Sequence, residues 1–275
     1  MTGTLTRRIV PVPDGELAVW SNERAGRPLV FLHGGGLDRR MWEQQVAAFA
    51  ETNHVVLVDA RGHGESSTAT DAYRHCDDVA AAFSALDLGP AVFVGLSMGG
   101  GTAVDVALEH PDLVAALVVS GVGTSEPEFT DPEFTDPWVL DVFAEWKAAE
   151  EARDAQRWLD AFLRFASGPY RSMDDVDPDV VDRLRRMAWD TLQHHAVQSF
   201  VPPTAVTRTW ERASSITVPV VAVSGTLDSP DHIGMAHRLA ATAPDGRVVD
   251  LPGTAHYPNM EQPAAFDEVV ADTAG

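Results

Sequence analysis

The sequence has one cysteine and few basic side chains. Because Cys76 is alone, an internal disulfide is impossible, and no partner for a catalytic thiol stands near it, so we expect a small buried residue there. Lys and Arg number 20 against 41 Asp and Glu, which gives a formal net charge of −21. That charge repels nucleic-acid phosphates, and no Lys/Arg cluster forms a local exception. We therefore expect no nucleic-acid partner, and the charge favours a neutral ligand over an anionic one.

Long apolar runs are also missing. Asp, Glu, Pro or Gly interrupts every hydrophobic stretch before the roughly 20 residues that a membrane span requires. Residues 1–8 lead directly into a strand-like segment and lack the apolar stretch of a signal peptide. These absences predict a soluble, cytoplasmic protein with no membrane partner. Apolar residues nevertheless make up 45% of the 275 residues, which suffices for one large domain with an insertion.

Short β-branched runs alternate with helical patterns in residues 9–122 and again from residue 218 to the end. This alternation predicts an α/β fold whose eight-stranded, mostly parallel sheet is flanked by helices. The first two strands should pair antiparallel across the turn at Pro13–Gly15. The predicted strands are 8–12, 17–21, 29–32, 55–59, 91–94, 114–120, 218–224 and 247–251, and the predicted helices are 40–50, 73–86, 101–109, 233–243 and 264–272.

The alternation stops in residues 124–212, where helical patterns occur at 139–152, 156–165 and 179–195 without a convincing strand. We interpret this segment as a helical cap inserted after the sixth strand, with residues 1–123 and 213–275 as the core domain. It begins with a short repeat at Pro127–Pro137, which reads as a connecting loop. The segment is rich in tryptophan, and together these rings suggest an apolar pocket wall: Trp138, Trp146, Trp158, Trp189 and Trp210.

A nucleophile turn is predicted at Gly95–Gly99, which has the pattern Gly-x-Ser-x-Gly. The pattern follows an apolar strand and opens a helix, and this setting pushes a serine hydroxyl out above the sheet. Glycine on both sides avoids collisions with the neighbouring backbone. Ser97 is therefore the candidate nucleophile.

A serine nucleophile needs a base to accept its proton and a carboxylate to orient that base. Asp228 follows the predicted strand 218–224, and His256 follows the strand 247–251, so both lie at the sheet edge that carries Ser97. The chain order Ser, Asp, His is the order expected for this fold. We predict Ser97, Asp228 and His256 as catalytic residues, with Asp231 as the alternative acid.

Backbone N–H groups must stabilise the negative oxygen that forms during such a reaction. The segment His33–Gly36 ends the third strand with three glycines, where an N–H can face substrate without side-chain obstruction. We assign the donors to Gly35 and Met98, with Gly34 as the alternative to Gly35. His33 is expected to be a structural hydrogen-bonding residue of this loop.

No cofactor or metal is expected. The carboxylates of Asp175–Asp179 lack the glycine and the final glutamate of a calcium loop, and they are typical of a solvated helix start. His194 and His195 stand in the cap without cysteine or a suitably spaced carboxylate pair. Neither a phosphate-binding Gly-x-x-x-x-Gly-Lys motif nor a dinucleotide fingerprint is present.

Five motifs together resemble the α/β-hydrolase superfamily: HGGG at 33–36, DARGHGES at 59–66, GLSMGG at 95–100, GTLD at 225–228 and HYPNMEQP at 256–263. The resemblance implies that Arg61 and His63 belong to a structural turn. Serine at position 97 disfavours the dehalogenase and epoxide-hydrolase chemistry of relatives that use Asp. The cap and the His-x-Pro-x-x-Glu ending look most like small-molecule esterases and lactonases such as 3-oxoadipate enol-lactonase.

The resemblance thus implies a serine hydrolase that cleaves a small, neutral, partly apolar carboxylic ester or lactone through an acyl-enzyme. The expected substrate-binding residues are Gly34, Gly36, Trp138, Trp189 and Tyr257. Carbon–carbon hydrolases of the meta-cleavage type, which share the Gly-Gly-Gly and Ser-Met-Gly-Gly stretches, are the alternative, as is a cyclase or lyase relative. A hydrolase-derived ligand receptor is a third reading. We expect a small-molecule substrate and a monomer or homodimer.

Overall fold

The computed structural model describes residues 4–125, 134–195 and 201–275. In these ranges no helix is long and apolar enough to cross a membrane. Eight strands form one sheet in the order β1-β2-β4-β3-β5-β6-β7-β8. Their bounds are β1 Thr6–Val12, β2 Gly15–Ser21, β3 Pro28–Leu32, β4 His54–Val58, β5 Ala91–Leu96, β6 Val114–Ser120, β7 Val220–Gly225 and β8 Gly246–Leu251. The expected eight strands are therefore confirmed, and their predicted ends lie within two residues of the observed ones.

Most of the sheet is parallel. β2 pairs antiparallel with both β1 and β4, and the remaining neighbours, from β4 to β8, pair parallel. The expected antiparallel start is thus confirmed. The turn between β1 and β2 contains Asp14 at a φ of 66°, a conformation that short polar residues tolerate.

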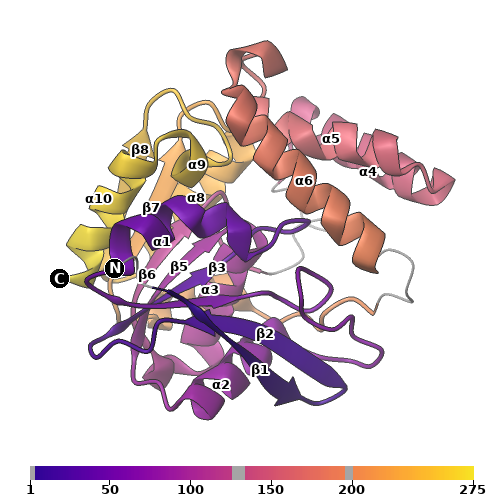
Figure 1. Cartoon of the computed structure of the whole chain (residues 1–275). Helices are drawn as coiled ribbons and strands as arrows, with labels where there is room; N and C mark the ends of the chain where they lie inside the picture. The colour runs from indigo at the N-terminus through magenta and orange to yellow at the C-terminus, as the bar shows by residue number, and fades with distance from the viewer. Residues whose placement is uncertain (1–3, 126–133, 196–200) are drawn as a thin grey trace.

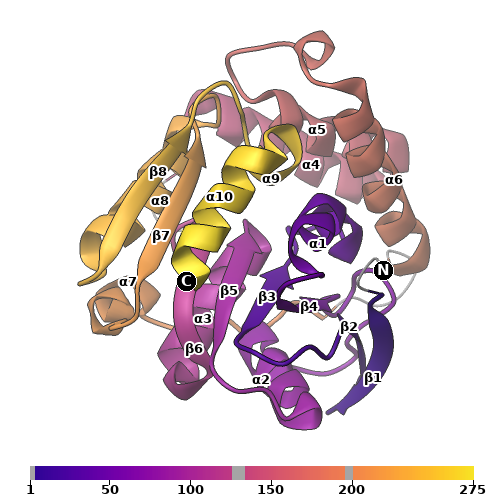
Figure 2. The ribbon, with the colours of Figure 1, turned by 60° about the vertical axis from the view of Figure 1, so that its left-hand side comes forward.

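Helices cover both faces of the sheet, and each face has its own apolar core. One core includes side chains of α1 and α10, and Figure 2 shows these helices on the near side of the sheet. The other core includes side chains of α2, α3 and α8 on the opposite face. The helices of this layer structure are α1 Glu43–Phe49, α2 His75–Leu86, α3 Met98–Glu109, α7 Thr209–Arg212, α8 Pro230–Thr242, α9 Pro258–Glu261 and α10 Pro263–Ala274.

Cys76, on α2, is fully buried in the second core, as expected. Burial raises the pKa of its thiol to about 12, so the side chain is an uncharged packing residue at neutral pH.

The predicted helix 40–50 is divided in two. A short 3-10 helix, η1 (Arg39–Trp42), precedes α1. The side chain of Asp38 caps η1 by accepting a hydrogen bond from the backbone N–H of Arg40. Similarly, α3 begins at Met98 rather than at residue 101, because the helix starts directly after the nucleophile turn.

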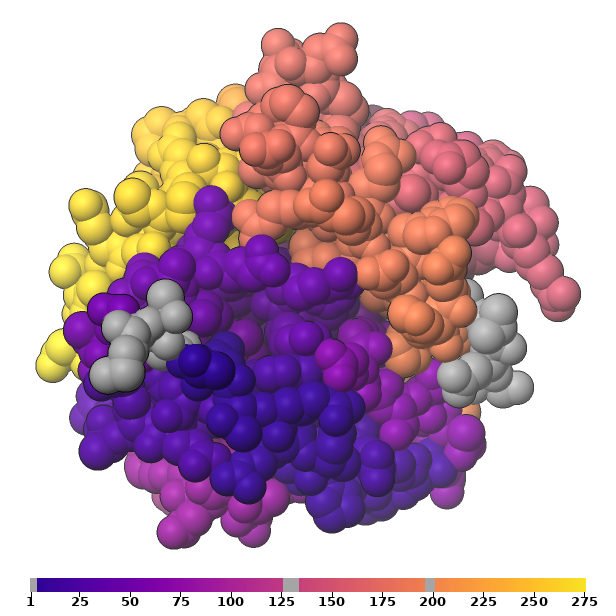
Figure 3. All heavy atoms as spheres, in the orientation of Figure 1, coloured from indigo at the N-terminus to yellow at the C-terminus, as the bar shows by residue number. Residues whose placement is uncertain are grey.

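The helical insert consists of α4 (Pro137–Ala152), α5 (Ala155–Ser167) and α6 (Pro178–His195), which lie together above the sheet in Figures 1 and 2. In Figure 3 the orange surface of α6 lies against the purple surface of the N-terminal half. Most of the repeat at 127–137 falls outside the described residues. Asp136 and Asp154 cap α4 and α5, because their side chains accept hydrogen bonds from N–H groups of the first turn.

The tryptophans expected in a pocket wall do not all lie in the insert. Trp146 and Trp158 pack edge to face at 5.0 Å between ring centroids, in the layer between α4 and α5. Trp210 instead belongs to α7 and packs against the core domain, where the guanidinium of Arg238 lies 3.9 Å from its ring centroid.

Candidate active site

Ser97 stands alone between β5 and α3 in a strained backbone conformation. Its φ is 52° and its ψ is −118°, a region that costs a non-glycine residue about 1–3 kcal/mol. The flanking glycines are required by close contacts: a Cβ on Gly95 would lie 2.4 Å from the carbonyl oxygen of Gly99, and one on Gly99 would lie 2.1 Å from that of Leu32. This is the sharp turn that the sequence pattern predicts.

Asp228 and His256 are in contact. Oδ2 of Asp228 lies 2.8 Å from Nδ1 of His256, and both side chains are almost completely buried. Asp228 lies three residues beyond β7, and His256 lies in the loop between β8 and α9. An imidazole held in this way by Nδ1 leaves Nε2 to act as the base.

The electrostatics of this pair favour an ionised acid and a neutral base. Burial opposes the charge of Asp228, but the imidazoles and hydrogen bonds around it outweigh burial and hold the pKa of the carboxyl well below its ordinary value. Burial lowers the pKa of His256 against the opposing influence of Asp228. His256 is therefore neutral at pH 7, as a proton acceptor must be.

The end of β6 joins Ser97 to the histidine. The backbone N–H of Ser97 donates to the carbonyl oxygen of Ser120 over 2.8 Å. The next residue, Gly121, has a φ of 66°, and a Cβ there would lie 2.7 Å from Cε1 of His256. The nucleophile turn thus contacts Ser120, and the imidazole of His256 packs against the next residue, Gly121. Gly121 was not singled out from the sequence, and its only signal is a glycine directly after a strand.

Aromatic rings surround His256. Phe165 of α5 lies 5.4 Å from it and Tyr257 lies 5.3 Å from it, measured between ring centroids. Trp138 of α4 packs edge to face on Phe165 at 5.9 Å. Trp189 lies on α6 with 37% of its surface exposed. Phe165 was not predicted as a site residue, because its spacing in the predicted helix is also that of an ordinary packing residue.

The backbone N–H groups of the glycine loop after β3 have different hydrogen-bond partners. The N–H of Gly34 donates to Sδ of Met41 at 3.3 Å, and that of Gly36 donates to Nε2 of His63 at 3.0 Å. Among the described residues, no acceptor faces the N–H of Gly35. A Cβ on Gly35 would lie 3.8 Å from Cβ of Met98. These contacts favour Gly35 over Gly34 as an oxyanion donor beside Met98.

His33 and His63 hold this loop in place. Nε2 of His33 accepts from the N–H of Ala60, while its Nδ1 lies 2.9 Å from the carbonyl oxygen of Gly34. Burial lowers the pKa of His63 to about 3, which keeps Nε2 of that ring free to accept from Gly36. Both imidazoles therefore have the structural role that was expected.

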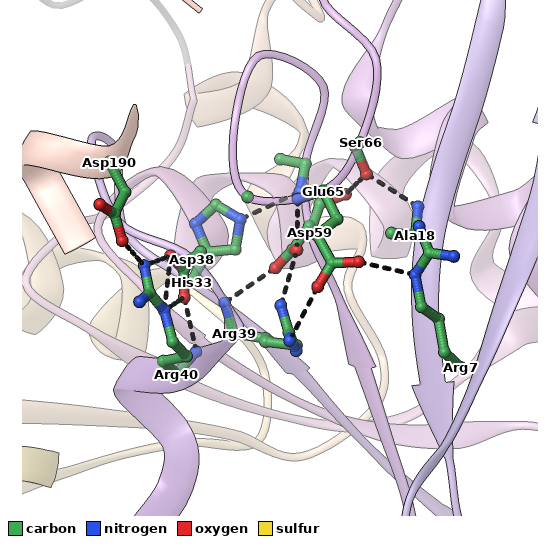
Figure 4. Close-up of polar contacts among 12 residues, drawn as sticks. Arg7, Ala18, His33, Asp38, Arg39, Arg40, Asp59, Glu65, Ser66 and Asp190 are labelled. Carbon is green, nitrogen blue, oxygen red and sulfur yellow. Dashed lines mark hydrogen bonds and ion pairs between the residues drawn. The ribbon is translucent and has the colours of Figure 1, made fainter. Parts of the chain in front are cut away.

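Carboxylates anchor the same loop, as Figure 4 shows. Asp59 accepts from the backbone N–H groups of Arg39 and Glu65, both over 2.9 Å. The guanidinium of Arg40 pairs with Asp38 at 2.6 Å and with Asp190 of α6 at 2.8 Å. The last contact ties the insert to η1, which directly follows the loop that carries Gly35.

The alternative acid, Asp231, is engaged elsewhere. Its Oδ2 accepts from the N–H of Thr135 at 2.9 Å and from that of Asp136 at 2.8 Å. It therefore fixes the start of α4, and the structure brings Asp228, not Asp231, to His256.

Two groups of described side chains have the composition of a metal site: Cys76, Asp77 and His110, and Asp228, His232 and His256. In the first group, Asp77 already pairs with Arg74 at 2.7 Å.

His195, one of the two adjacent histidines of the cap, has both ring nitrogens in contact with polar groups. Its Nδ1 contacts Oγ1 of Thr68, and its Nε2 contacts the carbonyl oxygen of Gly64.

Comparisons with known proteins agree with this geometry. The family model described as alpha/beta hydrolase fold matches residues 27–263. The chain is 27% identical to 3-oxoadipate enol-lactonase 2 of Acinetobacter baylyi over 252 residues, which cover 90% of this chain and 88% of that protein. It is 36% identical to a non-heme chloroperoxidase of Streptomyces lividans over 217 residues, covering 74% and 75%.

A solved structure is similar over nearly the whole length. Its title describes Est816 as an N-acyl homoserine lactone degrading enzyme, and it superposes with a TM-score of 0.74 at 26% identity, covering 96% of this chain and 99% of that one. The resemblance found in the sequence motifs is thus confirmed by whole-chain similarity.

Proposed function

Because this chain belongs to the family of the alpha/beta hydrolase fold, we propose that it is a cofactor-independent serine hydrolase that cleaves a small carboxylic ester or lactone. The observation that carries the proposal is the buried contact between Asp228 and Nδ1 of His256 beside the turn of Ser97. Lactonases and esterases among the relatives support this reaction class.

The reaction begins when Oγ of Ser97 attacks the carbonyl carbon while Nε2 of His256 accepts the hydroxyl proton. Asp228 keeps the imidazole in the required tautomer and stabilises the imidazolium that forms. The N–H groups of Gly35 and Met98 donate to the oxyanion, and such donors are worth about 3–4 kcal/mol each. The intermediate collapses to an acyl-enzyme as His256 gives its proton to the leaving alkoxide.

Water completes the cycle. His256 accepts a proton from a water molecule that attacks the acyl carbon. The second tetrahedral intermediate then releases the acid as His256 returns the proton to Oγ of Ser97. In a lactone the alkoxide and acyl group are one molecule, so the product is a single hydroxy acid.

Residues 124–212 are the cap in this proposal, and the aromatic side chains of α4 and α5 form the apolar part of the substrate site. Phe165 contacts His256, and Trp138 packs on Phe165, so an acyl chain beside the imidazole meets aromatic surface. Trp189, Tyr257 and the backbone of Gly34 and Gly36 remain the other candidates for substrate contact. A net charge of −21 favours a neutral substrate.

The proposal is tested by assaying p-nitrophenyl butyrate, an N-acyl homoserine lactone and a vinylogous diketone with the wild type and Ser97→Ala. We expect ester or lactone turnover that Ser97→Ala abolishes, with an unchanged circular dichroism spectrum. Ser215→Ala, an exposed serine after α7, is the matched control and should retain full activity. A fluorophosphonate should phosphonylate the wild type with loss of fluoride, which raises its mass by that of the reagent less HF, and leave Ser97→Ala unlabelled. Full activity of Ser97→Ala, or preference for the diketone, contradicts the proposal.

A further inference from the structure

Asp228 contacts a second imidazole that the mechanism does not use. Nδ1 of His232, in the first turn of α8, lies 3.1 Å from Oδ1 of Asp228 and 2.9 Å from Oγ of Ser229. His232 is 6% exposed, and its ring centroid lies 4.5 Å from that of His256.

The two oxygens of the carboxylate are thus divided between two histidines. Oδ2 faces His256, whereas Oδ1 faces His232 and also accepts from the backbone N–H of Ser229 at 2.7 Å. A carboxylate whose second oxygen has two donors cannot rotate without losing them. The contact to His232 therefore fixes the direction in which Oδ2 points.

We propose that His232 is a positioning residue, which locks Asp228 toward His256 and shares the carboxylate of Asp228 with it. This inference rests on the proposed serine-hydrolase function. It concerns a side chain that the sequence motifs do not mark, because His232 follows Asp228 by four residues in what reads as an ordinary helix start.

The second part of the proposal follows from charge. A positive charge on one of two imidazoles whose centroids are 4.5 Å apart disfavours a proton on the other. His232 lowers the pKa of His256, in the same direction as burial.

Apolar rings and a few ionisable side chains surround His232 and His256. Phe134 and Phe165 face His232 with apolar rings at 5.9 and 5.8 Å between centroids. Asp228 contacts both imidazoles, Tyr257 packs on His256, and Glu261 after His256 pairs with Arg171. Asp231, beside His232 in the chain, accepts from the N–H groups of Thr135 and Asp136. The other ionisable side chains of α8 include His237, which contacts Asp250 at an exposed position.

The test compares two substitutions with a matched control on the same helix. In His232→Asn the amide nitrogen can occupy the place of Nδ1, so the hydrogen-bond donor is kept and the second imidazole is removed. His232→Leu removes both. His237→Asn is the control, because His237 also lies on α8 and contacts a carboxylate, that of Asp250 at 3.0 Å, at an exposed position.

We expect His232→Asn to keep kcat at pH 8 within about threefold of the wild type, while the acid limb of its kcat/KM profile moves to higher pH by half a unit or more. His232→Leu should lose kcat about tenfold at pH 8, the effect of one charge-assisted hydrogen bond. His237→Asn should match the wild type in both measurements. An acid limb of His232→Asn that coincides with the wild type, or a wild-type kcat in His232→Leu, overturns the proposal.

A second measurement does not depend on activity. NMR titration of the His256 imidazole should show that its pKa is higher in His232→Asn than in the wild type. An unchanged His256 titration counts against the proposal even if His232→Leu does not fold. The proposed function fails separately, through an active Ser97→Ala. An inactive Ser97→Ala combined with unshifted His256 titration would overturn only the role of His232.

Discussion

Arg171 of the insert forms an ion pair with Glu261 of α9, and this pair joins the insert to the loop that carries His256. Their charged atoms lie 2.5 Å apart, and the side chains are 13% and 9% exposed. Arg171 also donates to the carbonyl oxygens of Ala166 and Gly253, while Glu261 accepts from the N–H of Ala255. The pair therefore links the insert to the loop that carries His256.

Removing Arg171 should destabilise the protein. In Arg171→Met the carboxylate of Glu261 is left in a mostly buried place without its cation, and such a loss costs about 3–5 kcal/mol. Glu261→Gln should be milder, because burial already raises the pKa of Glu261 and a neutral amide oxygen can still accept from Ala255. Thermal and urea unfolding measure both effects.

The control for this pair is Lys147→Met, which breaks the exposed ion pair with Glu151. A pair of this kind contributes about 0–1 kcal/mol. Equal losses in Lys147→Met and Arg171→Met would show that burial of the Arg171 pair has no special effect.

Substituting the two candidate acids should separate their roles. Asp228→Asn should lower kcat for a p-nitrophenyl ester by about 10³–10⁴-fold, because an amide favours the wrong imidazole tautomer. Asp231→Asn should keep kcat near that of the wild type, because its carboxylate contacts only the backbone at the start of α4 and Thr135 Oγ1 among described residues. The reverse ranking of the two kcat values would move the acid to Asp231.

Stability should depend on pH through Asp105 of α3. Burial raises the pKa of this carboxyl to about 7, despite a hydrogen bond from Ser125. Between about pH 4 and pH 7 the folded chain holds a proton that the unfolded chain releases, so the free energy of unfolding falls as the pH rises through this window. Asp105→Asn removes this contribution.

Urea unfolding at pH 4.5 and pH 8 measures the effect. The wild type should lose roughly 1–4 kcal/mol more than Asp105→Asn between these two values. Asp272→Asn, at an exposed position of α10, should behave like the wild type. Parallel pH dependence in wild type and Asp105→Asn would mean that the carboxyl ionises normally.

Phe165 should affect substrate binding more than an exposed aromatic of the same insert. Phe165→Leu removes the ring beside His256 and should raise KM for apolar acyl esters several-fold, since truncating a buried aromatic contact loses about 1 kcal/mol or more. Tyr170→Leu is the control, because Tyr170 is 60% exposed. KM for p-nitrophenyl acetate, butyrate and octanoate measures the difference, and it should grow with chain length.

Sequence patterns predicted the core well because the relevant physics is local. Alternation of β-branched and helical segments specifies strands and helices, and Gly-x-Ser-x-Gly specifies the turn because only glycine fits beside Ser97. The predicted positions of Asp228 and His256 at strand ends followed from the same reasoning, and the structure brings these two together.

Other parts of the site could not be predicted in this way. The sequence favoured Asp228 over Asp231 and Gly35 over Gly34, but it left the second residue of each pair as an alternative. The structure adds the hydrogen-bond partners of these groups: Thr135 for Asp231, and Met41 and His63 for the N–H groups of Gly34 and Gly36.

The sequence by itself determined which strands the candidate residues follow, the strained serine turn and the helical character of the insert. It could do so because backbone sterics and side-chain periodicity act over a few neighbouring residues. Only the tertiary structure decided that Gly121 makes room for an imidazole, that Phe165 covers it, and that His232 shares its carboxylate. Those contacts join residues from separate elements, and their distances depend on how the whole sheet and its helices pack.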